Sequence, residues 1–281
     1  MSGIGRITVL VDNCAQGRGL LGEHGLSFWI EVRGRGVLFD TGQGMALAHN
    51  AERLGVPLRR TDAVALSHGH YDHTGGLDHV LELAPQARVF AHPAVLERKY
   101  ARDAGEDSRE IGVPSVVRAG LARPRVWLHP TAQPTEICEG VFVTGEIPRR
   151  TAYEDTGGSF YADRKGESED PLVDDQALFI GSRTGTVVVL GCAHAGVINT
   201  LRYVRELTDG KPIRAVLGGM HLLKASRERM DRTIEALREL DVDCLAPGHC
   251  TGPAATAELW SALPGKCRAC GAGTRLEFEL P

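Results

Sequence analysis

The chain has 281 residues, of which 42% are hydrophobic, 24% charged and 5% aromatic, a composition that excludes collagen-like, fibrous and wholly disordered proteins. The 32 basic and 36 acidic residues leave a net charge of −4, which is too balanced to indicate a nucleic-acid or anionic-membrane partner. No apolar run approaches the roughly 18 residues of a transmembrane helix, and the first residues lack the pattern of a signal peptide. The seven scattered cysteines favour thiols or metal ligands in a reducing cytoplasm over a disulfide framework.

Hydrophobic periodicity predicts an alternation of strands and helices along the chain. Strands are expected at residues 7–11, 27–32, 36–40, 63–67, 88–92, 125–128, 141–144, 177–181, 186–190, 213–217, 242–246 and 274–280, with a tight turn at 182–185. Helices are expected at residues 45–54, 77–83, 94–102, 197–207, 226–240 and 254–263. Residues 103–123 show weak periodicity with Gly and Pro interruptions, which indicates a loop.

The order of these elements predicts an α/β architecture. Strands dominate the beginning and helices follow in each half, which favours two β-sheets packed face to face with helices outside. We expect a single domain over residues 1–281. Residues 146–175 are polar and rich in Gly, Asp and Arg, and so long a stretch without periodicity indicates a functional lid or an insertion. Residues 250–281 form a C-terminal segment that contains cysteines.

Four metal-capable side chains lie directly after the strand at 63–67, in the segment His68-Gly69-His70-Tyr71-Asp72-His73. In an extended segment His68, His70 and Asp72 lie on one side because strand side chains alternate, while His73 turns to the other side. One loop can then offer two imidazoles to one metal ion and a carboxylate with an imidazole to a second. Such ligands suit zinc, iron or manganese.

With this HxHxDH segment, LFDTG at residues 38–42 and GGL at 75–77, the chain resembles the metallo-β-lactamase superfamily. Four later segments are GEIPR at 145–149, GCAHAG at 191–196, GGMHL at 218–222 and PGHCTG at 247–252. Together they are similar to the 7,8-dihydropterin-6-methyl-4-(β-D-ribofuranosyl)-aminobenzene-5′-phosphate synthase-like proteins of that superfamily. The resemblance implies an αββα sandwich with two mixed sheets and with metal ions at the rim between them. It does not identify the substrate, because one fold serves many reactions.

The resemblance also implies further metal ligands. His194 and His249 follow strands, where the superfamily keeps its later ligands, and both are expected to bind metal. His221 also follows a strand. It is expected to be a metal ligand, a hydrogen-bond partner of a ligand or a proton donor. Many superfamily members have a histidine before the hairpin and a bridging aspartate after it. Here the matching regions hold Glu146 and either Cys192 or His194, so the ligand set is one member short or is completed by Glu146 or Cys192.

Polar residues in two other regions are candidate substrate contacts. Asp12 and Asn13 end the first strand and His24 lies in the Gly-rich loop that follows, although an ordinary solvated loop explains them equally well. Arg149 and Arg150 begin the 146–175 segment. Paired guanidinium groups suit a phosphate or carboxylate, and surface ion pairs are the alternative.

The C-terminal segment contains a CxxC motif, Cys267-Arg268-Ala269-Cys270. Together with Cys244 and Cys250 it can form a four-thiolate site for zinc or an iron–sulfur cluster. Cys244 lies in an apolar strand, however, and resembles a buried core thiol more than a ligand.

These observations favour a cytoplasmic metallo-hydrolase. One or two zinc ions, or iron or manganese, lower the pKa of a bound water, which attacks an ester, lactone or phosphoester. Asp72 is expected to bind metal and orient the nucleophile, and His221 to protonate the leaving group. The alternatives are a synthase that joins a pterin pyrophosphate to a ribosylaminobenzene phosphate, an iron-dependent redox or oxygen-chemistry protein, and a metal-stabilised binding module without catalysis. The expected partner is a small anionic molecule rather than nucleic acid or membrane, and the oligomeric state stays open.

Overall fold

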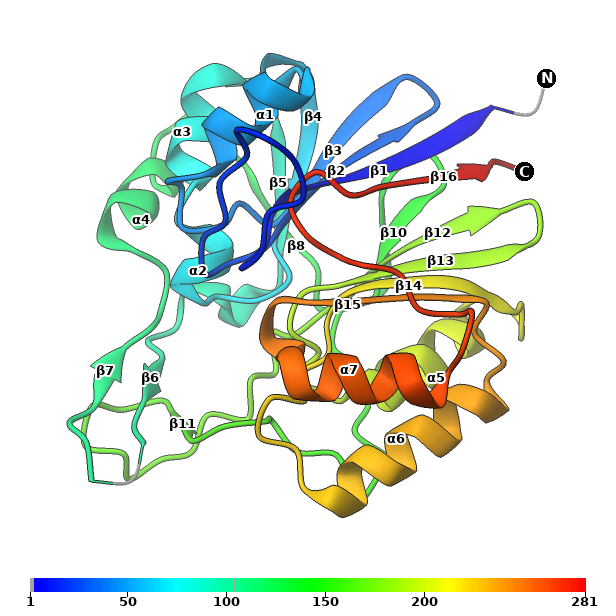
Figure 1. Cartoon of the computed structure of the whole chain (residues 1–281). Coiled ribbons are helices and arrows are strands. Elements are labelled where there is room, and N and C mark those ends of the chain that lie inside the picture. Colours follow the sequence, from blue (N-terminus) through cyan, green and yellow to red (C-terminus); the bar gives the residue numbers. More distant parts are fainter. Residues whose placement is uncertain (1–2, 104) are drawn as a thin grey trace.

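The computed structural model describes residues 3–103 and 105–281, and these residues form two large β-sheets and one small one (Figure 1). The first sheet contains, in spatial order, β16 (Arg275–Glu279), β1 (Ile4–Val11), β2 (Ser27–Val32), β3 (Arg35–Phe39), β4 (Thr61–Ala65), β5 (Arg88–Ala91) and β8 (Leu128–Pro130). The second contains β15 (Cys244–Gly248), β14 (Ile213–Gly219), β13 (Gly185–Leu190), β12 (Leu178–Ser182), β10 (Val141–Val143) and β9 (Thr135–Cys138). Both sheets mix parallel and antiparallel pairs.

Alternation along the strands places one hydrophobic core between the two sheets and a further core on the outer face of each. Phe28 and Ile30 of β2 point into the core between the sheets, whereas Trp29 packs on the outer side. Because strand side chains alternate with period two, a strand contributes side chains both to the core between the sheets and to the core on the outer face of its own sheet.

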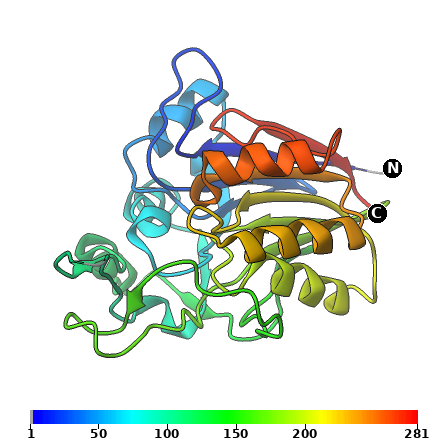
Figure 2. The same ribbon diagram turned by 60° about the horizontal axis from the view of Figure 1, so that its bottom comes forward.

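Helices cover the two outer faces. On the first sheet they are α1 (Leu47–Leu54), α2 (Tyr71–Thr74), α3 (Leu77–Leu83) and α4 (Ser115–Leu121), and on the second α5 (Val197–Leu207), α6 (Arg227–Glu239) and α7 (Pro253–Ala262). Figure 2 shows α5, α6 and α7 lying over the second sheet. Short 3-10 helices are η1 (Leu58–Arg60), η2 (Pro93–Leu96) and η3 (His249–Thr251). The layers are helix, sheet, sheet and helix, which confirms the predicted αββα sandwich.

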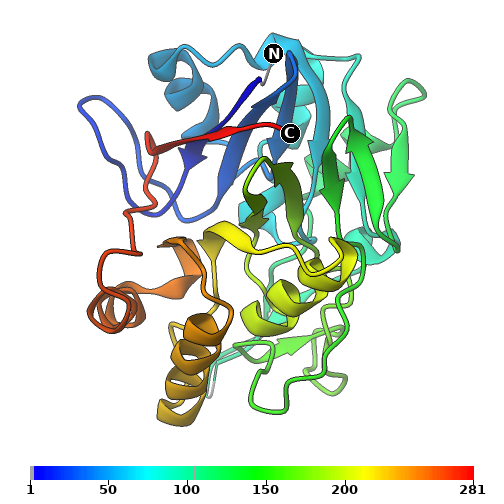
Figure 3. The same cartoon turned by 90° about the vertical axis from the view of Figure 1, so that its right-hand side faces the viewer.

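The two ends of the described chain lie beside each other. Strand β16 pairs with β1 in antiparallel register, with Ile4 opposite Glu279 and Thr8 opposite Arg275. Figure 3 shows these two strands at one edge of the first sheet. No helix among residues 3–103 and 105–281 is long and apolar enough to span a membrane.

Most predicted elements are present with ends shifted by a few residues, and three predictions between residues 94 and 130 are wrong. The expected helix at 94–102 is only the 3-10 turn η2, followed by strand β6 (Tyr100–Ala101). The expected loop at 103–123 contains β7 (Arg109–Glu110) and α4. The strand expected at 125–128 is β8, which begins at Leu128.

These differences arise from contacts that are distant in sequence. Strand β6 pairs with β7 and with β11 (Phe160–Tyr161), so a small sheet replaces the helix. Helix α4 buries Val117 and Leu121 against the core under the first sheet. Strand β9, which the sequence pattern did not indicate, pairs with β10 at the edge of the second sheet.

Candidate metal centre

The HxHxDH segment turns sharply after β4 instead of continuing as a strand. The backbone N–H groups of His73 and Thr74 both donate to the carbonyl of His70, and this closes the first turn of α2. The predicted alternation through Asp72 is therefore wrong, because Asp72 and His73 are helical. Gly69 is required at the turn, since a Cβ there would lie 2.1 Å from the carbonyl oxygen of Val95.

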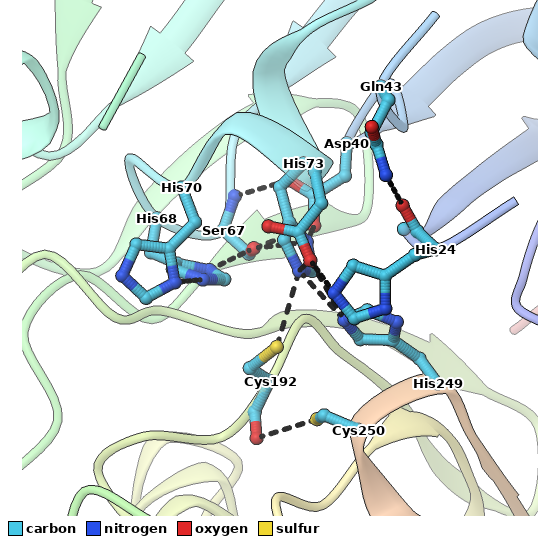
Figure 4. Close-up of polar contacts among 12 residues, drawn as sticks. His24, Asp40, Gln43, Ser67, His68, His70, His73, Cys192, His249 and Cys250 are labelled. Carbon is cyan, nitrogen blue, oxygen red and sulfur yellow. Dashed lines mark hydrogen bonds and ion pairs between the residues drawn. The ribbon is translucent and has the colours of Figure 1, made fainter. Parts of the chain in front are cut away.

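Four predicted histidine ligands and one cysteine meet where the two sheets adjoin. Their ligand atoms form two groups, His68–Cys192–His194 and His73–Cys192–His249, in each of which all atoms lie within 4.8 Å of one another. The Cys192 thiol belongs to both groups and lies 3.2 Å from His73 Nε2 (Figure 4). His73 Nε2 in turn lies 3.3 Å from His249 Nε2.

His70 and Asp72 lie on opposite sides of these two groups. His70 Nδ1 is 2.9 Å from His68 Nε2, and its ring lies 5.1 Å from that of His194. Asp72 Oδ2 is 3.5 Å from His249 Nε2 and 3.9 Å from His73 Nε2. The arrangement divides the ligands into one set near His68, His70 and His194 and another near Asp72, His73 and His249.

A second layer of hydrogen bonds fixes which nitrogen of each histidine faces the centre. The Nδ1–H of His73 donates to Asp40 Oδ2 at 2.7 Å, and that of His194 donates to the Thr156 carbonyl at 2.8 Å. The Nδ1–H of His249 donates to Asn13 Oδ1 at 2.8 Å. Such bonds to Nδ1 leave the lone pair of Nε2 free for a metal ion.

Ser67 extends this layer to His68. Its hydroxyl donates to Asp40 Oδ2 at 2.6 Å and so accepts from His68 Nδ1 at 2.9 Å. Figure 4 shows Asp40 and Ser67 behind the histidines. Asp40 follows β3 within the LFDTG motif, and the sequence pattern predicts neither Asp40 nor Ser67 as part of the site. An aspartate at a strand end within a family motif was the available signal for Asp40.

The chemistry of the cluster fits metal ions. The side-chain atoms His70 Nε2 and His194 Nε2 are buried and have no hydrogen-bond partner among the described residues. Burial lowers the pKa of His68, His70 and His194, so these imidazoles are neutral as metal binding requires. Packing several histidines together without a cation leaves lone pairs unsatisfied, and divalent ions such as zinc satisfy them.

Four residues in the turns around the site have a left-handed backbone conformation. Asp40 has φ 59°, Ala193 φ 55°, His221 φ 46° and His249 φ 48°. Non-glycine residues adopt this region only at a cost, and they concentrate where side chains must be aimed at a functional centre.

A cavity of about 310 Å³ opens over the second ligand group and is lined by Asn13, His24, Asp72, His221 and His249, among others. His24 Nε2 lies 3.1 Å from Asp72 Oδ2, and this hydrogen bond to Asp72 raises the pKa of His24. The His221 ring lies 4.3 Å from that of His194. Asn13, His24 and His221 therefore face the space that a substrate would occupy.

The 146–175 segment covers one wall of this cavity, and within it the described structure contains only the short strand β11. The ring of Phe160 lies 5.3 Å from His70 and 5.1 Å from His194. Gly157 packs on His221, because a Cβ at this glycine would lie 2.0 Å from His221 Cδ2. The segment thus contributes directly to the site.

Other predicted site residues lie elsewhere. Glu146 is exposed and belongs to none of the groups of possible ligands, so Cys192 and not Glu146 occupies the centre. Asp12 is buried and accepts from the backbone N–H of His249 at 2.8 Å, which makes it a support for that turn and not a substrate contact.

The two predicted arginines also have other partners. Arg149 donates to the carbonyls of His194, Pro171 and Leu172, so it anchors the 146–175 segment. Arg150 forms an exposed ion pair with Glu206 at 2.6 Å. Neither guanidinium lines the cavity over the metal centre.

The predicted four-thiolate site does not form. Among residues 3–103 and 105–281, no group of three possible ligands contains Cys244, Cys267 or Cys270. Cys270 lies in the core between the sheets, whereas Cys267 packs on the core beneath α5–α7. Cys250 instead joins Cys192 and His221 in a further group beside the metal centre.

Residues 21–249 match the family model described as the metallo-beta-lactamase superfamily. The chain belongs to this superfamily. The structure of Tm1679, described as a metal-dependent hydrolase of the β-lactamase superfamily, is 33% identical, covers 98% of this chain and 99% of its own, and superposes with a TM-score of 0.83. Zn²⁺-bound PqqB from Methylobacterium extorquens shares the fold at 13% identity, with 96% and 99% of the two chains covered and a TM-score of 0.57.

Two relatives come from Methanocaldococcus jannaschii. The uncharacterized protein MJ0448 is 32% identical over 90% of this chain and 93% of its own length. The 7,8-dihydropterin-6-methyl-4-(β-D-ribofuranosyl)-aminobenzene-5′-phosphate synthase is 30% identical over 82% of this chain and 81% of its own length. This agrees with the similarity that the four later motifs indicate. Since one relative is described as a hydrolase and another as a synthase, the family alone does not fix the reaction.

Proposed function

We propose that the protein is a metal-dependent hydrolase of a small phosphoester. The observation that carries the proposal is the pair of buried ligand groups that share the Cys192 thiol beside an open cavity. His68, His70 and His194 would hold one ion and Asp72, His73 and His249 a second, with Cys192 available to both. Bound zinc supplies a water nucleophile that ionises near neutral pH and a positive charge that stabilises a phosphoryl group. Because thiolate and imidazole ligands suit zinc or iron, manganese is the weaker candidate.

The charged lining of the cavity favours an anionic substrate. Arg102, Arg109 and Lys224 line it together with the carboxylates of Asp72 and Asp103. The Arg102 guanidinium lies 5.4 Å from the ring centre of Tyr161, which holds it at the cavity wall. Fixed guanidinium groups recognise phosphate oxygens well.

Residues of the chain can assist the proton transfers. His24 donates to Asp72 and thereby holds this carboxylate in one orientation. His221 lines the cavity, and its Nδ1 atom has no hydrogen-bond partner among the described residues. A histidine in this position can give a proton to the leaving group.

A synthase activity is the second candidate, supported by the relative that is named for it. That name describes a dihydropterin joined through its 6-methyl group to a ribofuranosylaminobenzene phosphate. Tyr71, Phe160 and Ile111 line the same cavity as the cationic residues, so the cavity offers surfaces for a planar ring as well as for a phosphate.

One assay separates the two candidates. Protein of known metal content is incubated with phosphomonoester, phosphodiester, carboxyl-ester and lactone substrates, and separately with a dihydropterin diphosphate and a ribofuranosylaminobenzene phosphate. Hydrolysis of a phosphoester that is lost in His221→Gln supports the hydrolase. A condensation product without phosphoester hydrolysis supports the synthase and overturns the first proposal.

A reducing, cytoplasmic location belongs to the same proposal. All seven cysteines are free, and Cys192 and Cys250 are buried beside the histidines. A thiol that serves the metal centre must stay reduced, which a cytoplasm provides. Fractionation of the native host should therefore place the protein with cytoplasmic markers.

A further inference from the structure

A second cavity lies between residues 150–153, helix α5 and the start of helix α6, away from the residues of the metal centre. Its volume is about 380 Å³. Four guanidinium groups line it, those of Arg150, Arg202, Arg229 and Arg232, against the single lining carboxylate of Glu228. We call it the arginine cavity. Although Arg150, Arg229 and Arg232 each also pair with a carboxylate outside the lining, the lining itself is positively charged and attracts anions.

Among these four arginines, Arg229 gives the strongest indication of a bound anion. Its side chain is 3% exposed, and one of its nitrogen atoms, Nη1, pairs with Asp155. The other two, Nε and Nη2, are buried and have no hydrogen-bond partner among the described residues. A buried guanidinium with unpaired N–H groups is costly, and an anion in the adjoining cavity would lower this cost.

Arg150 and Arg232 are held in place by further contacts. The Arg232 guanidinium lies 5.1 Å from the ring centre of Tyr153 and its Nε 3.6 Å from Glu235, and Arg150 pairs with Glu206. Helix α6 also begins here, with Ser226 as its N-cap and as a lining residue. The positive end of the helix dipole adds to the attraction for an anion.

We propose that the arginine cavity binds a multiply charged phosphate anion. Planar guanidinium groups match the oxygens of a phosphate group. The same loop that forms its wall also reaches the metal centre, because Asp155 pairs with Arg229 while the Thr156 carbonyl accepts from His194. The arginine cavity and the metal centre thus share a loop but no lining residue.

Hydrogen–deuterium exchange with inorganic phosphate as the probe tests this proposal. The wild-type protein with its metal content intact is compared with Arg202→Gln/Arg232→Gln. The control is Arg59→Gln/Arg60→Gln, which removes the same charge from two exposed residues on η1. We expect phosphate to slow exchange at residues 150–156 and 226–232 in the wild type and in the control. In the cavity variant we expect half-maximal protection to need about tenfold more phosphate.

Two outcomes overturn the proposal. One is a wild-type protein in which phosphate leaves exchange at these residues unchanged. The other is equal protection in the wild type and in Arg202→Gln/Arg232→Gln, which would mean that phosphate acts from the metal centre. Neither outcome bears on the proposed hydrolase, since the two variants leave its residues intact.

Discussion

The Sγ atom of Cys192 lies 3.2 Å from Nε2 of His73, and the same thiol is grouped with His68 and His194 on its other side. The thiol thus belongs to both groups of possible ligands, and Cys192 would help to hold a metal ion there. We expect Cys192→Ser to weaken metal binding by about 10–100-fold, because a serine hydroxyl does not ionise near neutral pH. Metal titration measures the effect. Cys138→Ser, at a half-buried thiol outside the ligand groups, is the control, and equal affinity in both variants would contradict the role of Cys192.

The ion pair between His73 and Asp40 predicts that the stability of the metal-free protein depends on pH. Burial opposes the charged form of His73, but the carboxylates of Asp40 and Asp72 raise its pKa from 6.5 to about 9. A raised pKa in the folded state stabilises the fold fully below pH 6.5, and this contribution is lost as pH rises through about 9.

Thermal unfolding of chelator-treated protein measures this effect. The difference in Tm between wild type and Asp40→Asn should be largest near pH 6.5 and should shrink toward pH 9. Asp62→Asn, at a partly exposed carboxylate that pairs with Arg35, controls for the loss of one charge. A Tm difference that is constant over this range would contradict the assignment to His73.

The turn at Gly69 predicts a strong effect of a single methyl group. In Gly69→Ala the new Cβ meets the Val95 carbonyl at 2.1 Å, so the backbone of the metal-binding loop must move. We expect a loss of about 1–3 kcal/mol in the free energy of unfolding, together with weaker metal binding. Gly181→Ala, whose Cβ would lie 3.8 Å from Pro281, should be nearly neutral. Urea unfolding compares the two, and similar stabilities would show that the loop tolerates the change.

A buried ion pair fastens this loop to the end of the 146–175 segment. Lys99 Nζ lies 2.9 Å from Asp174 Oδ1, and Asp174 Oδ2 accepts from the backbone N–H of Gly69 at 2.8 Å. Burial raises the pKa of Asp174, while Lys99 counteracts this shift. Lys99→Met leaves a buried carboxylate without its cation, and we expect a loss of about 3–5 kcal/mol.

The matched control is Lys224→Met, which removes an exposed ion pair with Asp103 and should cost under about 1 kcal/mol. Chemical unfolding of both variants gives the comparison. Should Lys99→Met unfold at the same denaturant concentration as Lys224→Met, the pair does not fasten the loop.

The sandwich and its main elements could be predicted because their signals are local. Strand β2 and helices α3 and α5 agree with the predicted bounds, since apolar periodicity over a few residues determines them. The small sheet of β6, β7 and β11 could not be predicted this way. Strand β11 is held there by pairing with β6 across about 60 residues of sequence, which no local pattern records.

Prediction of the site residues likewise succeeded where the signal is local in the sequence. His68, His70, Asp72 and His73 stand in one segment, so their proximity follows from the sequence. The resemblance to the superfamily placed His194 and His249 at strand ends, and the structure brings both into the cluster. Glu146 and the cysteines of the CxxC motif failed as candidates because sequence spacing does not say which way a side chain points. The support from Asp40 likewise depends on a contact between residues 33 positions apart.

The most direct test of the metal centre is elemental analysis of protein purified anaerobically without added metal, with the number of ions per chain. The account predicts about two zinc ions, or iron in their place, per wild-type chain. It also predicts fewer ions in Cys192→Ser than in Cys138→Ser. A wild-type protein that holds no metal and takes up none on titration with zinc, iron or manganese would contradict it.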